Sequence, residues 1–189
     1  MKRVGILGGT FDPPHIGHAI IANEVLQALQ LDEIRFMPNH TPPHKKKTQN
    51  VSNEDRIEML KMTIKDQPKF KLELIEQEES GISYTYETMQ LLHEKESDTQ
   101  FFFIIGADMI EYLPKWYRID DLVKIIQFVG VQRPPYATET VYPVKLIDAP
   151  QIYLSSSIIR EKVKQGISIQ YLVAPEVESY IKEKALYES

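Results

Sequence analysis

An eleven-residue string near the start of the chain, GGTFDPPHIGH over residues 8–18, constrains the fold more than any other feature. It follows a short apolar run at residues 4–7 and precedes the apolar, helix-forming segment 19–29. This order predicts a buried strand, a glycine-containing turn and a helix. Glycines at such a turn let the backbone approach a ligand closely, and the start of a helix offers N–H groups with a partial positive charge. The string therefore predicts a phosphate-binding turn within an α/β fold.

Strand and helix patterns alternate along the rest of the chain. Five adjacent apolar residues at 101–105 predict a central strand, since such a run needs cover on both faces. The alternation predicts a single Rossmann-like α/β domain over residues 1–189, with a parallel sheet flanked by helices and ligands at the carboxyl ends of its strands. The other strands are expected at 34–37, 70–75, 128–131 and 144–147, and the other helices at 52–66, 81–93, 120–126, 156–164 and 175–184.

Composition narrows the classes of partner. The formal net charge is −5, so no global basic field favours DNA, RNA or a membrane surface. The sequence contains no cysteine, which excludes a disulfide framework and a thiolate nucleophile. Its apolar runs are too short for a signal peptide or a transmembrane helix, and we expect a cytoplasmic protein. An exposed, aromatic-rich surface could support a homodimer, but the sequence does not show where such a surface lies.

Two histidines of the opening string, His15 and His18, stand beside the backbone that the glycines open. Imidazoles at this place can stabilise charge on a nucleotide phosphate. A zinc site that adds His40 and His44 is an alternative, because spacings of three and four residues suit metal ligands. Four loop histidines would be an unusual zinc site, however, and no carboxylate accompanies them in a suitable pattern. We therefore predict no protein-bound metal centre.

The tetrapeptide HIGH at residues 15–18 also occurs in class I aminoacyl-tRNA synthetases. A near match to their second motif, at residues 61–65, falls inside the predicted helix 52–66, where ordinary packing explains it. At 189 residues the chain is too short for a synthetase body with a tRNA-binding domain, and it is acidic. These observations favour a smaller nucleotide-binding protein.

A second anion-binding element is expected near residue 156, where three serines, Ser155 to Ser157, precede apolar residues and Arg160. Serines at a helix start cap it and leave N–H groups available. Arg160 lies one turn after Ser156 on the same face, so its guanidinium can join those amides on a phosphate. Taken alone, the same residues are better explained by an ordinary capped helix.

Two segments suit a second, anionic substrate. His44 and Lys45 follow two rigid prolines in a basic loop, although a solvated charge run would look similar. Tyr84 and Thr85 stand near a predicted helix start, where free amides suit a carboxylate.

Two further segments follow the central strand. Gly106 and Asp108 come directly after it, where an Asp side chain can hold ribose hydroxyls. Trp116, the single tryptophan, is a candidate for stacking on a ring, and core or lid packing is the alternative explanation.

Together these segments resemble the nucleotidylyltransferase superfamily and, within it, the bacterial nicotinate-nucleotide adenylyltransferases. The likeness covers essentially the whole chain and is carried by GGTFDPPH, PPHK, SYTY, IGADM, PKWY and SSSIIR. The resemblance implies that ATP and nicotinate mononucleotide react to give deamido-NAD and pyrophosphate in NAD biosynthesis. Mg²⁺ is expected to enter with ATP, held mostly by phosphate and water.

The resemblance also implies roles for individual residues. Catalytic charge stabilisation is implied for His18, His15 and Arg160. The ATP contacts are implied for Gly8, Gly9, Thr10, Phe11, His15, His18, Ser155, Ser156 and Arg160. The mononucleotide contacts are implied for His44, Lys45, Tyr84, Thr85, Gly106, Asp108 and Trp116, with Trp116 stacked on the nicotinate ring.

The sequence also allows other functions. Pantetheine-phosphate adenylyltransferases typically carry Thr where this chain has His15, and cytidylyltransferases lack the Pro-Pro pair and the Trp116 segment. A non-catalytic nucleotide-binding or sensor domain with the same fold is the alternative from another class. Both histidines and Arg160 favour the enzyme, because a site that only binds a nucleotide would not need all three.

Overall fold

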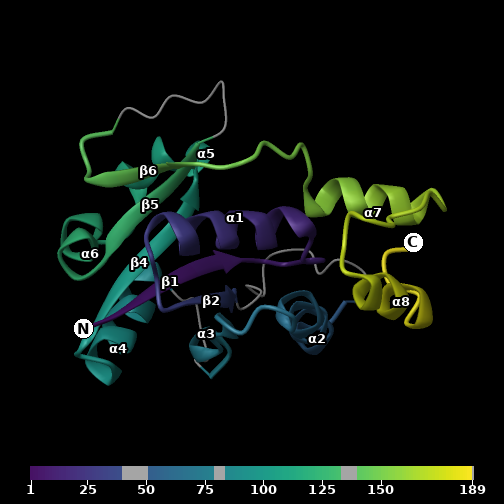
Figure 1. The fold of residues 1–189 in the computed structure, drawn as a ribbon, viewed down its shortest axis with the longest axis horizontal. Coiled ribbons are helices and arrows are strands. Elements are labelled where there is room, and N and C mark those ends of the chain that lie inside the picture. The colour runs from purple at the N-terminus through teal and green to yellow at the C-terminus, as the bar shows by residue number, and fades with distance from the viewer. Residues whose placement is uncertain (40–50, 79–83, 133–139, 189) are drawn as a thin grey trace.

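A computed structural model describes residues 1–39, 51–78, 84–132 and 140–188 of the chain. These residues form a six-stranded, all-parallel sheet in the order β3-β2-β1-β4-β5-β6 (Figure 1). This is the doubly wound strand order, so the predicted Rossmann-like parallel sheet is confirmed. The strands are β1 Lys2–Gly9, β2 Glu33–Pro38, β3 Phe70–Leu72, β4 Thr99–Gly106, β5 Gln127–Gln132 and β6 Val144–Asp148.

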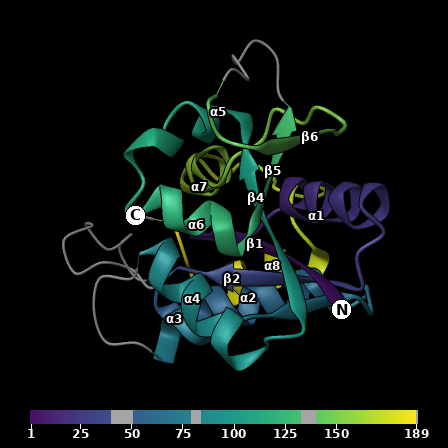
Figure 2. The same cartoon turned by 90° about the vertical axis from the view of Figure 1, so that its left-hand side faces the viewer.

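Helices cover both faces of the sheet, with α1 and α6 on opposite sides (Figure 2). Within the described ranges, no helix is both long enough and apolar enough to cross a membrane. The helices are α1 Ile16–Ala28, α2 Asn53–Ile64, α3 Ile75–Glu78, α4 Thr85–Lys95, α5 Ala107–Ile110, the 3₁₀ helix η1 Leu113–Lys115, α6 Ile119–Ile125, α7 Ser156–Lys164 and α8 Pro175–Glu183.

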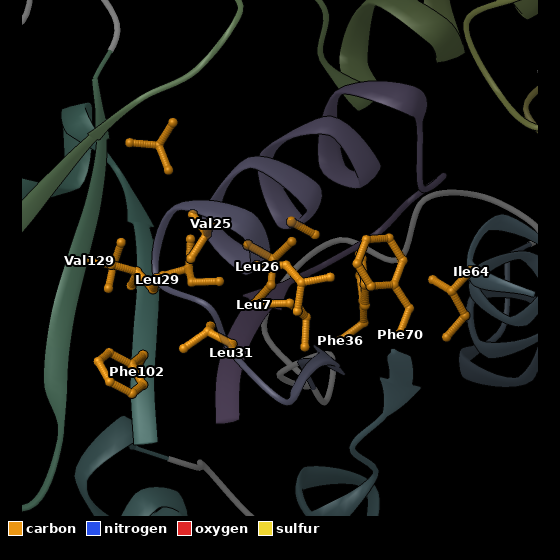
Figure 3. Packing of buried hydrophobic residues seen from close by; sticks show 14 of the residues in the cluster. Leu7, Val25, Leu26, Leu29, Leu31, Phe36, Ile64, Phe70, Phe102 and Val129 are labelled. Atoms are coloured by element: carbon orange, nitrogen blue, oxygen red, sulfur yellow. The ribbon is translucent and has the colours of Figure 1, made fainter. Parts of the chain in front are cut away.

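The central strand β4 shows why the sheet needs two layers of helices. Phe102 and Ile104 pack with α1 and α2 in one apolar cluster, part of which Figure 3 shows. Phe101, Phe103 and Ile105 face the other way, into a cluster with α4, α5 and α6. Successive side chains of a strand point to opposite faces, so the unbroken apolar run at 101–105 supplies both cores at once.

The chain after β6 builds a third apolar cluster against α2. Met59 of α2 lies in this cluster with Ile159 of α7 and Val177 of α8. The backbone N–H of Ile16, the first residue of α1, donates to the carbonyl of Leu172 at 3.0 Å. The C-terminal helices are therefore anchored beside the start of α1, far from the N-terminus in Figure 1.

Three expected elements have bounds that differ by three or more residues at one end. The helix expected at 81–93 begins at Thr85, after the N-cap residue Tyr84, and ends at Lys95. The helix expected at 19–29 begins at Ile16, because His15 has an extended backbone and its N–H donates to the side chain of His18, as in a helix cap. The strand expected at 70–75 ends at Leu72, since the Ile75 N–H donates to the Glu73 side chain at 3.2 Å and α3 begins there. The short helices α3, α5 and η1 have three or four residues and were not predicted.

A cluster of charged side chains joins β2 to its neighbours. Arg35 contacts Glu33 at 2.7 Å, Glu73 at 3.1 Å and Glu96 at 2.5 Å. The hydrogen bond from Arg35 holds the pKa of Glu96 below its ordinary value. Burial raises the pKa of Glu33, but hydrogen bonds from Lys2 and Arg35 outweigh it, so this pKa is also lowered.

We expect Arg35→Met to lower the free energy of unfolding at pH 7 by about 2–3 kcal/mol, because it leaves carboxylates facing one another. Since folding lowers the pKa values of Glu33 and Glu96, their contribution exists above the unfolded pKa and is lost as pH falls through the folded one. The variant should therefore lose less stability than the wild type between about pH 5 and pH 3. Denaturant unfolding across this range measures both effects.

Lys61→Met is the matched control, since Lys61 forms an exposed pair with Glu58. It should change stability by less than about 0.5 kcal/mol at either pH. An Arg35→Met protein with the acid profile of the wild type would contradict the role given to this cluster.

Candidate active site

The predicted phosphate-binding turn lies at the carboxyl edge of the sheet, where β1 and β4 are neighbours. Leu7 pairs with Ile104 near the end of this ladder, so the chain at Gly9 and at Gly106 leaves the sheet from the same edge. The strand order changes direction between β1 and β4, and doubly wound sheets bind ligands at this position. The topology thus brings the N-terminal string and the IGADM segment to one edge of the sheet.

Side chains from distant parts of the chain hold the turn at residues 10–14 by its carbonyl oxygens. Arg56 Nη1 donates to the carbonyl of Thr10 at 2.5 Å. Arg160 Nη1 donates to that of Asp12 at 2.7 Å, and Ser156 Oγ to that of Pro13 at 2.8 Å. The turn is therefore fixed by α2 and α7 as well as by its own prolines.

Phe11 sits in this turn with a left-handed backbone, at φ 50°. Its ring is 2% exposed and lies edge-on to His18, with centroids 4.9 Å apart. A Cβ at Gly9 would come within 3.0 Å of the same ring. The Thr10 carbonyl is held by Arg56, so the N–H of Phe11, across that trans peptide bond, points away from Arg56. The Phe11 ring is thus a packing element of the turn.

The two histidines stack on each other at the start of α1. Their ring centroids are 3.7 Å apart, with 24° between the planes. The His15 N–H donates to Nδ1 of His18 at 3.1 Å, so a neutral His18 ring carries its proton on Nε2. His15 is 5% exposed and His18 is half-buried. The arrangement presents the N–H of one imidazole and orients it with the other.

Gly17 explains the spacing of the histidines. A Cβ at this position would lie 2.9 Å from Nδ1 of His15 and 3.0 Å from its Cε1. Real Cβ atoms essentially never make a contact as short as 2.9 Å. A glycine at position 17 therefore leaves room for the ring of His15, which lies over the first turn of the helix. The spacing within the HIGH tetrapeptide is thus required for the packing of the two histidine rings as well as for their proposed chemistry.

The serine-rich segment starts α7 beside the start of α1, as Figure 1 shows. Ser155 is the N-cap residue, and its side chain accepts from the N–H of Ile158 at 3.3 Å. The neighbouring Ser156 bonds to the turn, and Arg160 Nη2 donates to Ser157 Oγ at 3.1 Å. Ser155, Ser156 and Arg160 therefore lie with the histidines, and two of them also hold the turn in place.

The residues expected to meet the second substrate come together on the other side of β4. Tyr84 is the N-cap residue of α4 and stacks on Tyr117, with centroids 4.5 Å apart, while Thr85 is the first residue of that helix. Trp116 is half-buried, and its ring meets Phe103 and Phe128 edge-on at 6.0 and 5.7 Å. The packing explanation and the ligand explanation for Trp116 are therefore compatible.

Gly106 is the N-cap residue of α5, and Asp108 belongs to that helix. His40, His44 and Lys45 lie outside the described residues.

Comparisons with known proteins decide the family. Residues 6–162 match the model of the cytidylyltransferase-like family. The chain is 52% identical over its full length, and the full length of the relative, to nicotinate-nucleotide adenylyltransferase of Bacillus subtilis. The chain belongs to the nicotinate-nucleotide adenylyltransferase family. It is also 54% identical, over 99% of its length and 87% of the relative, to a probable member from Geobacillus thermodenitrificans.

A solved structure agrees in fold. Nicotinic acid mononucleotide adenylyltransferase of Plasmodium falciparum, complexed with NaAD, matches with a TM-score of 0.83 and 21% identity. The match covers 100% of this chain and 98% of the other. At 21% identity this likeness supports the fold of the present chain and nothing further.

Three residues that hold the site were not predicted from the sequence. Arg56 is 3% exposed, and burial lowers its pKa while the charge of Asp12 acts in the opposite direction. A buried arginine within the helical apolar pattern of α2 is a signal that could have been found. Asp12 and Tyr187, which bond to each other, give no local signal, because 175 residues separate them.

Among the described residues, no group of three or more His, Cys, Asp or Glu side chains could hold a metal ion.

We expect Gly17→Ala to lower turnover by about 10- to 100-fold, because the added methyl displaces His15 and the stacked His18. The substitution also gains about 1 kcal/mol of helix propensity, so the melting temperature should fall little or not at all. Steady-state kinetics and thermal unfolding, compared with the exposed control Gln27→Ala on the same helix, measure the two effects. Wild-type turnover in Gly17→Ala would show that the His15 ring can move without consequence.

Proposed function

We propose that this protein transfers the adenylyl group of ATP to nicotinate mononucleotide, giving deamido-NAD and pyrophosphate. The observation that carries the proposal is the meeting of two helix starts, α1 and α7, at one rigid turn. His18 follows this turn at the start of α1, and Arg160 of α7 donates to a carbonyl of the same turn, at the carboxyl edge of the sheet. The acceptor comes from the family, through full-length relatives such as the Bacillus subtilis enzyme.

The reaction needs no covalent intermediate and no general base. A phosphate oxygen of the mononucleotide, already anionic, attacks the α-phosphorus of ATP in line with the leaving group. The bond between that phosphorus and the bridging oxygen to the β-phosphate breaks, and pyrophosphate departs with the electron pair. Catalysis then rests on aligning the two phosphates and on stabilising the charge that develops.

The geometry supports a division of labour around ATP. His18, with its proton on Nε2, would donate to an oxygen of the α-phosphate. His15, Arg160 and the start of α7 at Ser155 and Ser156 would act on the leaving pyrophosphate. The ATP contacts of Gly8, Gly9, Thr10 and Phe11 would be made through the backbone of the turn, which helix α2 holds through Arg56.

The mononucleotide would lie between α4 and the Trp116 segment. The first turn of α4 begins at Thr85, and backbone N–H groups at a helix start have no acceptor within the helix, which suits the nicotinate carboxylate. Stacking of Tyr84 on Tyr117 holds this helix start next to Trp116. Asp108 and Gly106 would meet the ribose, and His44 and Lys45 the phosphate.

The remaining parts of the proposal concern the setting of the reaction. Mg²⁺ is the proposed ion that accompanies ATP, and it supplies charge neutralisation on the phosphates. We assign the activity to a single domain over residues 1–189, in the cytoplasm, with no nucleic-acid or membrane partner. Self-association as a homodimer remains part of the proposal and is tested by sedimentation.

Release of pyrophosphate tests the function directly. The protein is incubated with ATP, Mg²⁺ and one acceptor at a time: nicotinate mononucleotide, nicotinamide mononucleotide, pantetheine phosphate or none. We expect the fastest release with nicotinate mononucleotide. Binding of ATP without release in any mixture would instead support a nucleotide sensor.

We expect His18→Ala to lower kcat by about 10²–10³, the effect of losing one preorganised donor to a developing charge. KM values for both substrates should change much less, because the contact strengthens in the transition state. Steady-state kinetics with each substrate varied in turn measures this. Near wild-type turnover would remove His18 from the mechanism.

We expect Trp116→Ala to raise KM for nicotinate mononucleotide by about tenfold or more through loss of ring stacking, and to leave KM for ATP nearly unchanged. Because the ring also packs on Phe128, the variant should lose about 2–4 kcal/mol of stability. Phe128→Leu is the control: it disturbs the same packing from within the core. Equal rises of KM in both variants would assign Trp116 to packing alone.

A further inference from the structure

A tyrosine near the end of the described chain reaches the phosphate-binding turn. Tyr187 follows α8 and is 4% exposed, in the third apolar cluster with Ile181 and Leu186. Its hydroxyl donates to Oδ1 of Asp12 at 2.6 Å. Asp12 is itself 7% exposed, so the two side chains meet in the interior behind the turn.

The backbone of this segment is held in an unfavourable conformation. Tyr187 has a φ of 65° and Ala185 a φ of 50°, in the left-handed region that bulky residues rarely adopt. Such a conformation persists only where surrounding contacts determine it, and it is typical of places where position matters. Here the contacts are the buried ring of Tyr187 and its bond to Asp12.

Burial and the nearby charges raise the pKa of Tyr187, so its hydroxyl stays protonated and donates to Asp12. Burial raises the pKa of Tyr187, and the nearby charge of Asp12 and the hydrogen bond raise it further. The positive charges of Arg160 and Arg56 act in the opposite direction without reversing the shift. The hydroxyl therefore keeps its proton throughout the neutral range and remains the donor of this bond.

Asp12 is the point at which several of these contacts meet. Its side chain accepts from Tyr187, and its carbonyl accepts from Arg160 at 2.7 Å. The next carbonyl, that of Pro13, accepts from Ser156. Three residues after Asp12 comes His15, the N-cap residue whose N–H orients His18. The position of Asp12 thus sets the course of the chain into the histidine pair.

We propose that Tyr187 is a positioning residue for adenylyl transfer, acting through its hydrogen bond to Asp12 to fix the turn that carries His15 and His18. This inference rests on the proposed function for its kinetic consequence. Its structural consequence, a more mobile turn without the hydroxyl, is independent of the reaction. Tyr187 does not touch the substrates in this assignment.

Tyr187→Phe removes the hydroxyl and keeps the ring. We expect kcat to fall by about 5- to 20-fold, since a small misplacement of catalytic groups is costly in rate. KM for nicotinate mononucleotide should change less than about twofold, because that substrate lies on the α4 side. Amide hydrogen exchange in residues 11–18 should become about five- to tenfold faster, while α4 exchanges as in the wild type.

Tyr180→Phe is the matched control. Tyr180 comes from α8 and its hydroxyl donates to Oδ1 of Asp55 at 2.8 Å, so the variant also loses one tyrosine–aspartate bond of the C-terminal cluster. It should leave kcat and exchange in residues 11–18 within about twofold of the wild type, even if its melting temperature falls as much. Equal effects of the two variants would reduce Tyr187 to a general stabilising residue.

A double-mutant cycle with Asp12→Ala tests the route of the effect. If Tyr187 acts through Asp12, adding Tyr187→Phe to Asp12→Ala should change kcat by less than about twofold. The same 5- to 20-fold loss in both backgrounds would overturn the proposal. Tyr187→Leu, which also removes the ring, should reproduce the faster exchange of residues 11–18.

The outcomes separate the two proposals. A wild-type protein that releases no pyrophosphate with nicotinate mononucleotide contradicts the proposed function, whereas exchange in residues 11–18 still decides the role of Tyr187. An active wild type with unchanged kcat and unchanged exchange in Tyr187→Phe contradicts the positioning role alone.

Discussion

Three backbone carbonyls of the turn at residues 10–14 accept hydrogen bonds from side chains of α2 and α7, and the candidate site depends on these bonds. A turn at a sheet edge has few ladder partners, and its carbonyls would otherwise need water. Two of the donors are guanidinium groups, and hydrogen bonds to charged groups are worth about 1.5–3 kcal/mol each. Pro13 and Pro14 of this turn have no backbone N–H that needs a partner. Because the turn is held through its carbonyl oxygens, these contacts do not use its remaining N–H groups.

This mode of anchoring also sets the electrostatics of the site. Arg56 and Arg160 bring two positive charges to the turn, opposed by the carboxylate of Asp12. Together with the starts of α1 and α7, they make a region of positive potential in a chain whose formal net charge is −5. A bound triphosphate would meet charges already in place, which lowers the reorganisation that the reaction requires.

The histidine pair shows how local sequence and tertiary contacts combine. The spacing of His15 and His18 places both rings at the start of one helix, and Gly17 leaves room for them to stack. The edge of Phe11 lies against His18, and Phe11 belongs to the apolar cluster beneath α1. The residue proposed to act on the substrate is thus supported by the same core that holds the sheet together.

The sequence alone is enough to predict the alternation of strands and helices, the parallel sheet and the two helix starts proposed to bind anions. These features follow from short-range patterns: the apolar run at 101–105, the glycines before a helix, and the serines before Arg160. The sequence did not predict the start of α1, because histidine is not among the usual capping residues and the bond from the His15 N–H to the His18 side chain depends on how the two rings pack.

Packing between distant segments brings Arg56 and Tyr187 to the turn at residues 10–14 and lets Ser156 and Arg160 hold it. Each of these contacts joins residues 46 or more positions apart. Periodicity and capping rules act over a few residues, whereas such pairs are set by how α2, α7 and α8 pack around Met59. Short motifs therefore predict the candidate functional residues, whereas the contacts that hold them can be identified only in the folded structure.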